Sequence, residues 1–314
     1  MLKLENVSKI YKIGTFGGKE LHAVSDVSFE IKDKEMVSLI GESGSGKSTI
    51  GKMILKLIAI SSGQILFNNM DISTIGKSEL KEYYRKVQGV FQDPFSSYNP
   101  IFKADRIFQI LHDEFYPGMK QEEWSARIPP ALEAVGLNPG TVMNKFPHQL
   151  SGGQLQRLLI ARALLLDIRF LVADEIISML DASTRIDVLN LLADLKAQGL
   201  SILFITHDLS LAHYISERAL ILYRGRVAEM GATEKIFDNP QHPYTKMLMA
   251  SVPRLDKKWE QEREELKTSQ PSIGSGCVFY HRCPVSESIC ATYNPSLLET
   301  ESDHSVACIH YEEG

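Results

Sequence analysis

A glycine-rich stretch, GESGSGKST (Gly41 to Thr49), holds the residue types that bind a chain of phosphates. It fits the pattern G-x-x-x-x-G-K-[ST], in which backbone N–H groups converge on phosphate oxygens and the helix that follows adds its positive N-terminus. A lysine in this pattern neutralises the β- and γ-phosphates, and the next hydroxyl binds Mg²⁺. The residues expected to contact a nucleoside triphosphate here are Gly41, Ser43, Gly44, Gly46, Lys47, Ser48 and Thr49.

Two adjacent acids end an apolar run, FLVADE (Phe170 to Glu175). Asp174 is placed to hold Mg²⁺ through water, and Glu175 is placed to accept a proton from an attacking water. Consecutive acids at a sheet edge are usually only solvated. The phosphate loop in the same chain favours the catalytic interpretation.

A second glycine pair occurs in LSGGQLQR (Leu150 to Arg157), which has no lysine at the position a phosphate loop requires. Ser151 fits a helix N-cap, and Gln154 three residues later fits a capping box. A helix start with Gly152, Gly153 and an exposed hydroxyl is an anion-binding surface. An ordinary capped helix is the alternative interpretation.

Four cysteines, Cys277, Cys283, Cys290 and Cys308, all lie near the end of the chain, with gaps of five, six and seventeen residues between them. Disulfides suit oxidising compartments, zinc sites usually pair ligands at shorter spacing, and iron–sulfur clusters accept looser spacing. The residues alone leave these alternatives open. His281 and His304 are possible further ligands, but both are expected at the polar surface.

The elements that position these residues alternate between strand and helix. Apolar runs predict buried strands at 36–41, 87–91, 170–174 and 201–206, and helices are expected at 154–166 and 183–198. Such alternation predicts an α/β fold with a parallel sheet. The alternating pattern from Ala23 to Ile31 predicts a half-buried antiparallel strand. Between Asp93 and Gln149 the pattern is helical and looped, as in an inserted subdomain.

The composition is that of an ordinary globular protein, with 314 residues, 44% hydrophobic residues and a net charge of -5. The charge argues against nucleic-acid binding. The start of the chain has no secretory signal, and no apolar run approaches the roughly 18 residues that cross a bilayer. A cytoplasmic protein is expected, which other chains would hold at a membrane. The charged stretch at 254–267 is expected to be a solvated helix or linker.

The order of the glycine loop, VFQD with Gln92, LSGGQLQR, VADE, SMLD and ITHD with His207 resembles the ATP-binding cassette of ABC transporters over about residues 2 to 250. The resemblance implies a P-loop NTPase core of the α/β class with an antiparallel β subdomain. It also implies a cassette at 1–253, with its helical subdomain at about 93–150, and a linker and Cys-rich tail at 254–314.

The resemblance also implies roles for single residues. In this family two cassettes face each other head to tail, so that Ser151 and Gly153 of one cover the ATP held by Lys47 and Ser48 of the other. Glu175 would be the catalytic base, His207 would hold the γ-phosphate, and Gln92 would sense Mg²⁺ and the attacking water. Ser178 to Asp181 would link the two sites, and Tyr11 would stack on adenine. The family commonly has proline at the position of Ile176, a departure that leaves every reacting group in place. The full expected set is Tyr11, the phosphate loop, Ser151, Gly152, Gly153, Gln154 and Asp181 for the nucleotide, Glu175, His207 and Gln92 for catalysis, and Ser48, Gln92 and Asp174 for Mg²⁺.

A closer resemblance, to the ATPases of oligopeptide and dipeptide importers, rests on VFQDPFSSYNP (Val90 to Pro100), NPQHPYTKMLMASVP (Asn239 to Pro253) and the cysteine tail. It implies a second, different ATPase subunit, two permeases and an extracellular binding protein, with this chain peripheral at the cytoplasmic face of the membrane. It favours a [4Fe–4S] cluster on the four cysteines over zinc. SMLDASTR also resembles importers of oligosaccharides, which leaves a sugar cargo as an alternative. A soluble ABC ATPase unconnected to transport is the alternative of another class.

Overall fold

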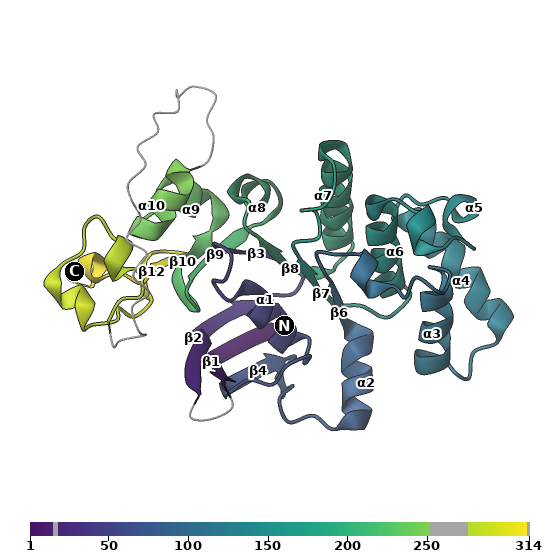
Figure 1. The fold of residues 1–314 in the computed structure, drawn as a ribbon, viewed down its shortest axis with the longest axis horizontal. Helices are drawn as coiled ribbons and strands as arrows, with labels where there is room; N and C mark the ends of the chain where they lie inside the picture. The colour runs from purple at the N-terminus through teal and green to yellow at the C-terminus, as the bar shows by residue number, and fades with distance from the viewer. Residues whose placement is uncertain (15–17, 252–275, 313–314) are drawn as a thin grey trace. The chain divides into compact units, whose positions relative to one another are not determined.

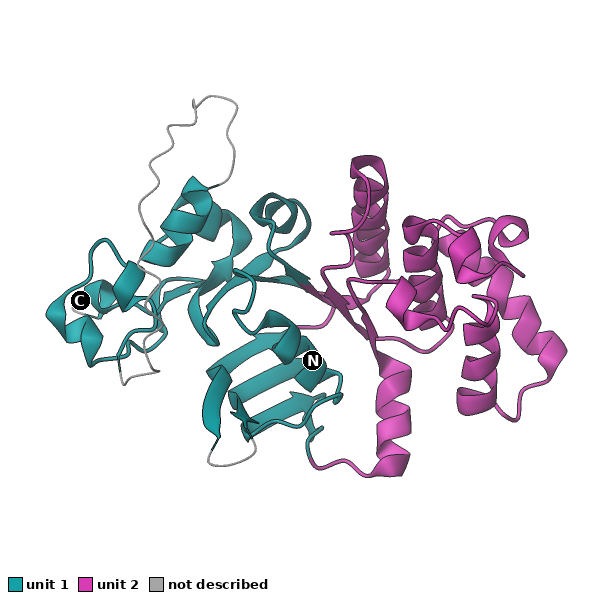
Figure 2. Cartoon of the chain, viewed as in Figure 1, with its two compact units in different colours: residues 1–31, 36–73, 205–314 teal, residues 32–35, 74–204 magenta. Residues whose placement is uncertain are grey.

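The computed structural model describes residues 1–14, 18–251 and 276–312 of the chain. It divides into two compact units (Figure 2). Unit 1 comprises Met1–Ile31, Met36–Ser73 and Ile205–Gly314, and unit 2 comprises Lys32–Glu35 and Thr74–Phe204. The predicted linker at 254–267 lies outside the described residues.

An antiparallel sheet forms the N-terminal part of unit 1 (Figure 1). Its strands are β1 (Leu2–Ile13), β2 (Lys19–Ile31), β4 (Ser62–Phe67) and β5 (Met70–Asp71), in the order β2-β1-β4-β5. Because side chains alternate between the two faces of a strand, β2 buries Val27 and Phe29 while Ser28 and Glu30 are exposed. The predicted antiparallel strand is confirmed.

A second set of strands in unit 1 includes the end of the chain. The strands are β3 (Met36–Ile40), β9 (Arg218–Tyr223), β10 (Arg226–Ala232), β11 (Leu298–Glu301) and β12 (His304–Val306), in the order β11-β12-β10-β9-β3. β3 is parallel to β9, whereas β9, β10, β12 and β11 pair antiparallel in turn. The cysteine-rich tail therefore extends the sheet that contains β3, β9 and β10, which the sequence did not predict.

The hydrophobic core of unit 1 also includes the tail. Unit 1 contains the helices α1 (Lys47–Ile54), α8 (Leu209–Ile215), α9 (Thr233–Asp238) and α10 (Pro243–Ala250). It also contains the 3₁₀ turns η3 (Tyr280–Arg282), η4 (Ser288–Ala291) and η5 (Ile309–Tyr311). Tyr223 of β9, Tyr244 of α10 and Phe279 belong to one buried cluster. Phe279 is 1% exposed and packs edge-on against Tyr223, with ring centroids 5.2 Å apart. This aromatic contact anchors the tail in the core.

Unit 2 contains buried strands between helices. They are β6 (Val87–Val90), β7 (Phe170–Asp174) and most of β8 (Ser201–Thr206), since the boundary between the units follows Phe204. β6 and β7 are parallel, and every residue of β7 and β8 is buried. Helices α2 (Lys77–Lys86), α6 (Gly152–Leu164) and α7 (Ala182–Ala197) complete this part. The predicted burial is confirmed for β7 and β8, and the predicted parallel pairing is confirmed for β6 and β7.

Residues 93–149 form helices and turns, and this stretch, which the structure describes in full, contains no strand. Its elements are η1 (Phe95–Ser97), α3 (Arg106–Phe115), α4 (Gln121–Ala134), α5 (Pro139–Val142) and η2 (Pro147–Gln149). Trp124 is fully buried, and its indole N–H donates to the carbonyl oxygen of Phe108 at 3.1 Å. The predicted helical and looped character of this segment is confirmed.

One histidine of the tail lies where it was not expected. His304 is 1% exposed, and its Nε2 lies 2.7 Å from Oε1 of the equally buried Glu229. The expectation of a surface position for His304 is wrong because β12 pairs with β10 and brings the ring onto Glu229. His281, by contrast, is exposed as expected.

Candidate active site

The phosphate loop joins β3 to α1 in unit 1, and its glycines are sterically required. A Cβ atom on Gly41 would lie 2.2 Å from the carbonyl oxygen of Leu222. Gly46 has a φ of +105°, which disfavours other residues, and a Cβ there would lie 2.4 Å from the carbonyl oxygen of Ala23. The backbone of other segments of this chain, at Leu222 and Ala23, therefore packs against the loop and holds it in this shape. Ser43 and Gly44 lie exposed at its tip.

The start of α1 fits a phosphate group. Gly46 is the N-cap and supplies no side-chain hydrogen bond, and the first turn has no acidic residue, so nothing on the helix competes with an anion. The buried ammonium of Lys47 donates to the carbonyl oxygens of Gly41 at 2.7 Å and Glu42 at 3.0 Å. Ser48 and Thr49 follow in the first turn. Lys47, Ser48 and Thr49 are thus the first three residues of α1, and their contact with phosphate and Mg²⁺ stays a prediction.

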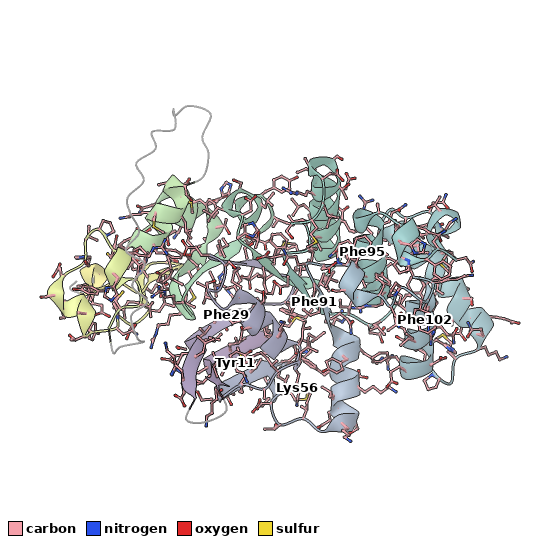
Figure 3. The ribbon with its side chains drawn as sticks, viewed as in Figure 1. Tyr11, Phe29, Lys56, Phe91, Phe95 and Phe102 are labelled. Atoms are coloured by element: carbon pink, nitrogen blue, oxygen red, sulfur yellow. The ribbon has the colours of Figure 1, made fainter. Side chains whose placement is uncertain are left out.

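Two more predicted residues lie on unit 1. His207 directly follows β8, and the adjacent Asp208 caps α8 by accepting from the N–H of Ser210 at 2.9 Å. Tyr11 lies inside β1 (Figure 3), with the ammonium of Lys9 5.0 Å from its ring centroid. β1 extends to Ile13 because its end pairs with the start of β2. Stacking on adenine stays a prediction.

The acidic pair lies on unit 2, at the end of β7. Asp174 is the last residue of the strand and is 6% exposed. Glu175 has a φ of +50°, a conformation that costs energy for a residue with a side chain and is concentrated at functional sites. The amide and hydroxyl of Ser178 both donate to the carbonyl oxygen of Glu175, at 3.1 and 2.8 Å, and so fix the turn. Ile176 is buried at 1% exposure, so this position contributes to the core.

Gln92 follows β6 on the same unit, and its side chain is exposed. Next to it, the carbonyl oxygen of Phe91 accepts from the side-chain amide of the buried Gln156 at 3.3 Å, and Asp93 accepts from the N–H of Phe95 at 2.9 Å. These two bonds hold the backbone on both sides of Gln92. Its side chain is therefore presented from a fixed segment.

The start of α6 has the predicted capping box. The hydroxyl of Ser151 accepts from the N–H of Gln154 at 3.2 Å, and the side chain of Gln154 accepts from the N–H of Ser151 at 2.9 Å. Gly152 and Gly153 form the first turn. A Cβ on Gly153 would lie 2.6 Å from Cγ2 of Thr184, so the starts of α6 and α7 approach closely.

Asp181 caps α7. Its carboxylate accepts from the N–H and hydroxyl of Thr184 at 3.0 and 2.7 Å and from the hydroxyl of Ser183 at 2.6 Å. The bond from Ser183, followed by those from Thr184, holds the pKa of Asp181 well below its usual range. The side chain thus has a structural partner, and a contact with nucleotide stays a prediction.

The predicted residues therefore form two sets. Unit 1 brings together the phosphate loop and carries Tyr11 and His207, and unit 2 carries Gln92, the Asp174–Glu175 turn and the adjacent starts of α6 and α7. The chemistry available is that of binding a polyphosphate and activating a water molecule.

Family models match two parts of the chain. Residues 24–178 match the model described as ABC transporter, and residues 228–290 match that described as oligopeptide/dipeptide transporter, C-terminal region. The oligopeptide transport ATP-binding protein AppF of Bacillus subtilis is 40% identical over 324 aligned positions, which cover 99% of this chain and 97% of the relative. This chain belongs to the ATP-binding subunits of ABC transporters. The oligopeptide transport ATP-binding protein OppF of Haemophilus influenzae is 38% identical over 295 positions, which cover 92% and 89% of the two chains.

Solved structures agree with this assignment. A dimeric bacterial ABC transporter cassette matches with a TM-score of 0.67 and 33% identity, over 74% of this chain and 99% of that chain. A post-hydrolysis dimer bound to ADP and phosphate matches with a TM-score of 0.66 over the same shares. The P-loop fold of the ABC ATPases is thereby confirmed, and the subunit is an ATPase that uses ATP with Mg²⁺. In the parts of the chain that the structure describes, no helix is both long and apolar enough to traverse a bilayer.

The four cysteines are free thiols, and all of them line one small cavity together with Phe279. Burial raises the pKa of Cys277, Cys283 and Cys308. Yet among residues 1–14, 18–251 and 276–312 no group of three or more histidine, cysteine, aspartate or glutamate side chains is arranged to hold a metal ion. The cluster prediction is therefore not supported by this arrangement of the side chains.

The sequence reasoning missed two residues beside the site, Glu42 and Arg282. Glu42 is a variable position of the glycine loop, and Arg282 lies between two cysteines of the tail. The guanidinium of Arg282 donates to both carboxylate oxygens of Glu42, at 2.8 and 2.9 Å. No local pattern signals a contact between residues so far apart in the chain.

Proposed function

We propose that this chain powers the uptake of oligopeptides or dipeptides by hydrolysing ATP. The observation that carries the proposal is the match to the oligopeptide/dipeptide transporter C-terminal region in the same chain as the cassette. Relatives named for oligopeptide transport, AppF and OppF, align over nearly the full length. Because both names refer to peptides, the oligosaccharide alternative is set aside.

Within this function we assign Lys47 to the β- and γ-phosphates, and Ser48, Gln92 and Asp174 to Mg²⁺. Glu175 would take the proton of the attacking water, and His207 would orient the γ-phosphate. Ser151 and Gly153 would close the site of a second cassette. Their position supports this role, because they lie at a glycine-containing helix start with no acidic residue in its first turn.

The importer would contain two permeases, a second and different ATPase subunit and an extracellular binding protein. This chain would then work at the cytoplasmic face of the membrane, held there by the permeases. The peptide-transporter C-terminal region supports this assembly. A soluble ATPase unconnected to transport would have none of these partners.

One experiment separates an importer subunit from a soluble ATPase. The tagged chain is purified from detergent-solubilised membranes, and the proteins that co-purify with it are identified by mass spectrometry. We expect permeases, and we expect ATP hydrolysis by the purified complex to rise when binding protein loaded with peptide is added. A chain recovered without permeases, or hydrolysis that responds to oligosaccharide and not to peptide, contradicts the proposal.

The catalytic assignment is tested separately by Glu175→Gln. Loss of the base should lower the rate of phosphate release by at least about 100-fold and leave ATP binding intact. Glu122→Gln, an exposed carboxylate on α4, is the matched control and should match the parent. Equal phosphate release by Glu175→Gln and the parent contradicts the role of Glu175.

We also propose that Cys277, Cys283, Cys290 and Cys308 hold a [4Fe–4S] cluster. The support is that all four cysteines line a single cavity. Protein purified without oxygen should contain about four iron atoms and absorb in the thiolate-to-iron region, and Cys308→Ser should lose both. Colourless protein with one zinc per chain contradicts the cluster and supports zinc.

A further inference from the structure

The tail and the phosphate loop are connected within unit 1. The anchor is Phe279, which is buried against Tyr223 and Tyr244, with ring centroids 5.2 and 5.5 Å away. Arg282 ends the 3₁₀ turn that begins one residue after Phe279. Its guanidinium lies 5.6 Å from the ring centroid of Tyr223 and 5.9 Å from that of Phe279. The buried rings thus hold the side chain of Arg282 in one direction.

The guanidinium of Arg282 binds the carboxylate of Glu42 through a fork, that is, through two parallel hydrogen bonds. Nη1 donates to Oε2 at 2.8 Å and Nη2 donates to Oε1 at 2.9 Å. Two parallel bonds of this kind fix both distance and orientation, which a single lysine ammonium cannot do. The hydrogen bonds that Arg282 donates to Glu42 are the main cause that raises the pKa of Arg282.

The backbone of Glu42 is part of the phosphate-binding structure. Its carbonyl oxygen accepts from Nζ of Lys47 at 3.0 Å and from the N–H of Ser45 at 3.1 Å. Its N–H donates to the hydroxyl of Tyr244 at 3.0 Å. Glu42 is therefore held on its backbone by α10 and on its side chain by the tail. Arg282 therefore binds the same residue, Glu42, whose carbonyl oxygen accepts from Lys47.

We propose that Arg282 is a positioning residue for ATP binding: through its fork on Glu42, the C-terminal tail holds the phosphate loop in the shape that receives the nucleotide. The inference rests on the proposed assignment of Lys47 to the phosphates. A loop held in its binding shape loses less conformational freedom when ATP binds, and ATP therefore binds more tightly. The side chain of Glu42 is 40% exposed, so solvent screens the pair and the effect is modest.

The test uses the full chain in its purified membrane complex. The variants are Arg282→Gln, Glu42→Gln and the double variant. Each removes a charge of the fork, and Glu42→Gln also keeps the shape of the side chain. Arg224→Gln is the matched control, because its guanidinium also lies 5.6 Å from the ring centroid of Tyr223 but its side chain is exposed. The measurements are the kcat and KM for ATP, the Kd of a fluorescent ATP analogue and the melting temperature.

We expect Arg282→Gln and Glu42→Gln each to raise KM and Kd about 3- to 10-fold, with kcat changed less than about twofold. Because both variants break the same fork, the double variant should be no worse than either single one. Glu42→Gln leaves the tail sequence intact, so a shared effect cannot come from an unfolded tail. A structural role alone would lower the melting temperature and the active fraction without moving KM.

Unchanged KM and Kd in folded Arg282→Gln, or effects that add in the double variant, overturn the inference. Lys47→Ala distinguishes this from a failure of the site itself. If Lys47→Ala abolishes nucleotide binding while Arg282→Gln matches the parent, only the positioning role is wrong. If Lys47→Ala binds ATP as the parent does, the assignment of the phosphate loop is wrong.

Discussion

The buried pair of Glu229 and His304 offers a quantitative test of how the tail is attached. Both side chains are fully buried, and Glu229 accepts three hydrogen bonds, from the N–H of Gln241 at 2.8 Å, the N–H of His242 at 2.9 Å and Nε2 of His304 at 2.7 Å. The change is Glu229→Gln, which keeps the shape of the side chain. A glutamine has one acceptor oxygen, and its NH₂ group would face at least one of the remaining N–H donors.

The expected loss of stability follows from the number of hydrogen bonds that Glu229 accepts. Each buried donor left without an acceptor costs about 1–3 kcal/mol, and bonds to a charged acceptor are stronger than bonds to a neutral one. With one donor orphaned and the charge removed, Glu229→Gln should destabilise the β10–β12 pairing by about 2–4 kcal/mol. Since 1.4 kcal/mol is a factor of ten, the tail should open about 30- to 700-fold more often.

The assay is the labelling of Cys308, which is 8% exposed and lies two residues after β12. In metal-free, reduced protein, a thiol reagent reaches it when the strand pair opens, and mass spectrometry gives the labelling rate. Glu299→Gln is the control, because this exposed carboxylate on β11 accepts one hydrogen bond that glutamine retains. A Glu229→Gln rate within about threefold of the parent would refute the reasoning.

Three other outcomes follow from single contacts. Burial lowers the pKa of His242 to about 4 from its usual 6.5, and its Nδ1 accepts from the N–H of Tyr244 at 3.0 Å, so the neutral ring is the folded form. Because the unfolded chain binds the proton more readily, the free energy of unfolding should fall by up to about 3 kcal/mol as the pH falls from about 6.5 to about 4. Urea unfolding measures this change, and a His242→Asn variant with the same pH dependence would contradict the assignment to His242. Gly46→Ala should abolish binding of a fluorescent ATP analogue, because its Cβ would meet the carbonyl oxygen of Ala23, whereas Gly118→Ala, where nothing lies within 4 Å of a Cβ, should bind as the parent does. Asp181→Ala removes the cap of α7 and should cost about 1 kcal/mol in urea unfolding. Asp194→Ala, at an exposed position in the same helix, is the comparison, and equal midpoints for the two variants would show that the cap is not stabilising.

Much of the fold was predictable because its signals are local. The alternation in β2, the apolar runs of β7 and β8 and the glycine loop are each contained in a few consecutive residues. The capping box of Ser151 and Gln154 lies within four consecutive residues, so its hydrogen bonds follow from the sequence of one turn. These segments determine the elements and the types of the reacting groups.

Only the tertiary structure determined what holds those segments in place. The two glycines that cannot bear a Cβ are constrained by Leu222 and Ala23, which no pattern within the loop reveals. Glu229 meets His304 across 75 positions, and Arg282 meets Glu42 across 240. Contacts between such distant residues form only when the whole sheet assembles, because the chain between them imposes no preferred separation. The reacting groups of this ATPase subunit are therefore encoded locally, and their positions depend on the packing of distant parts of the chain.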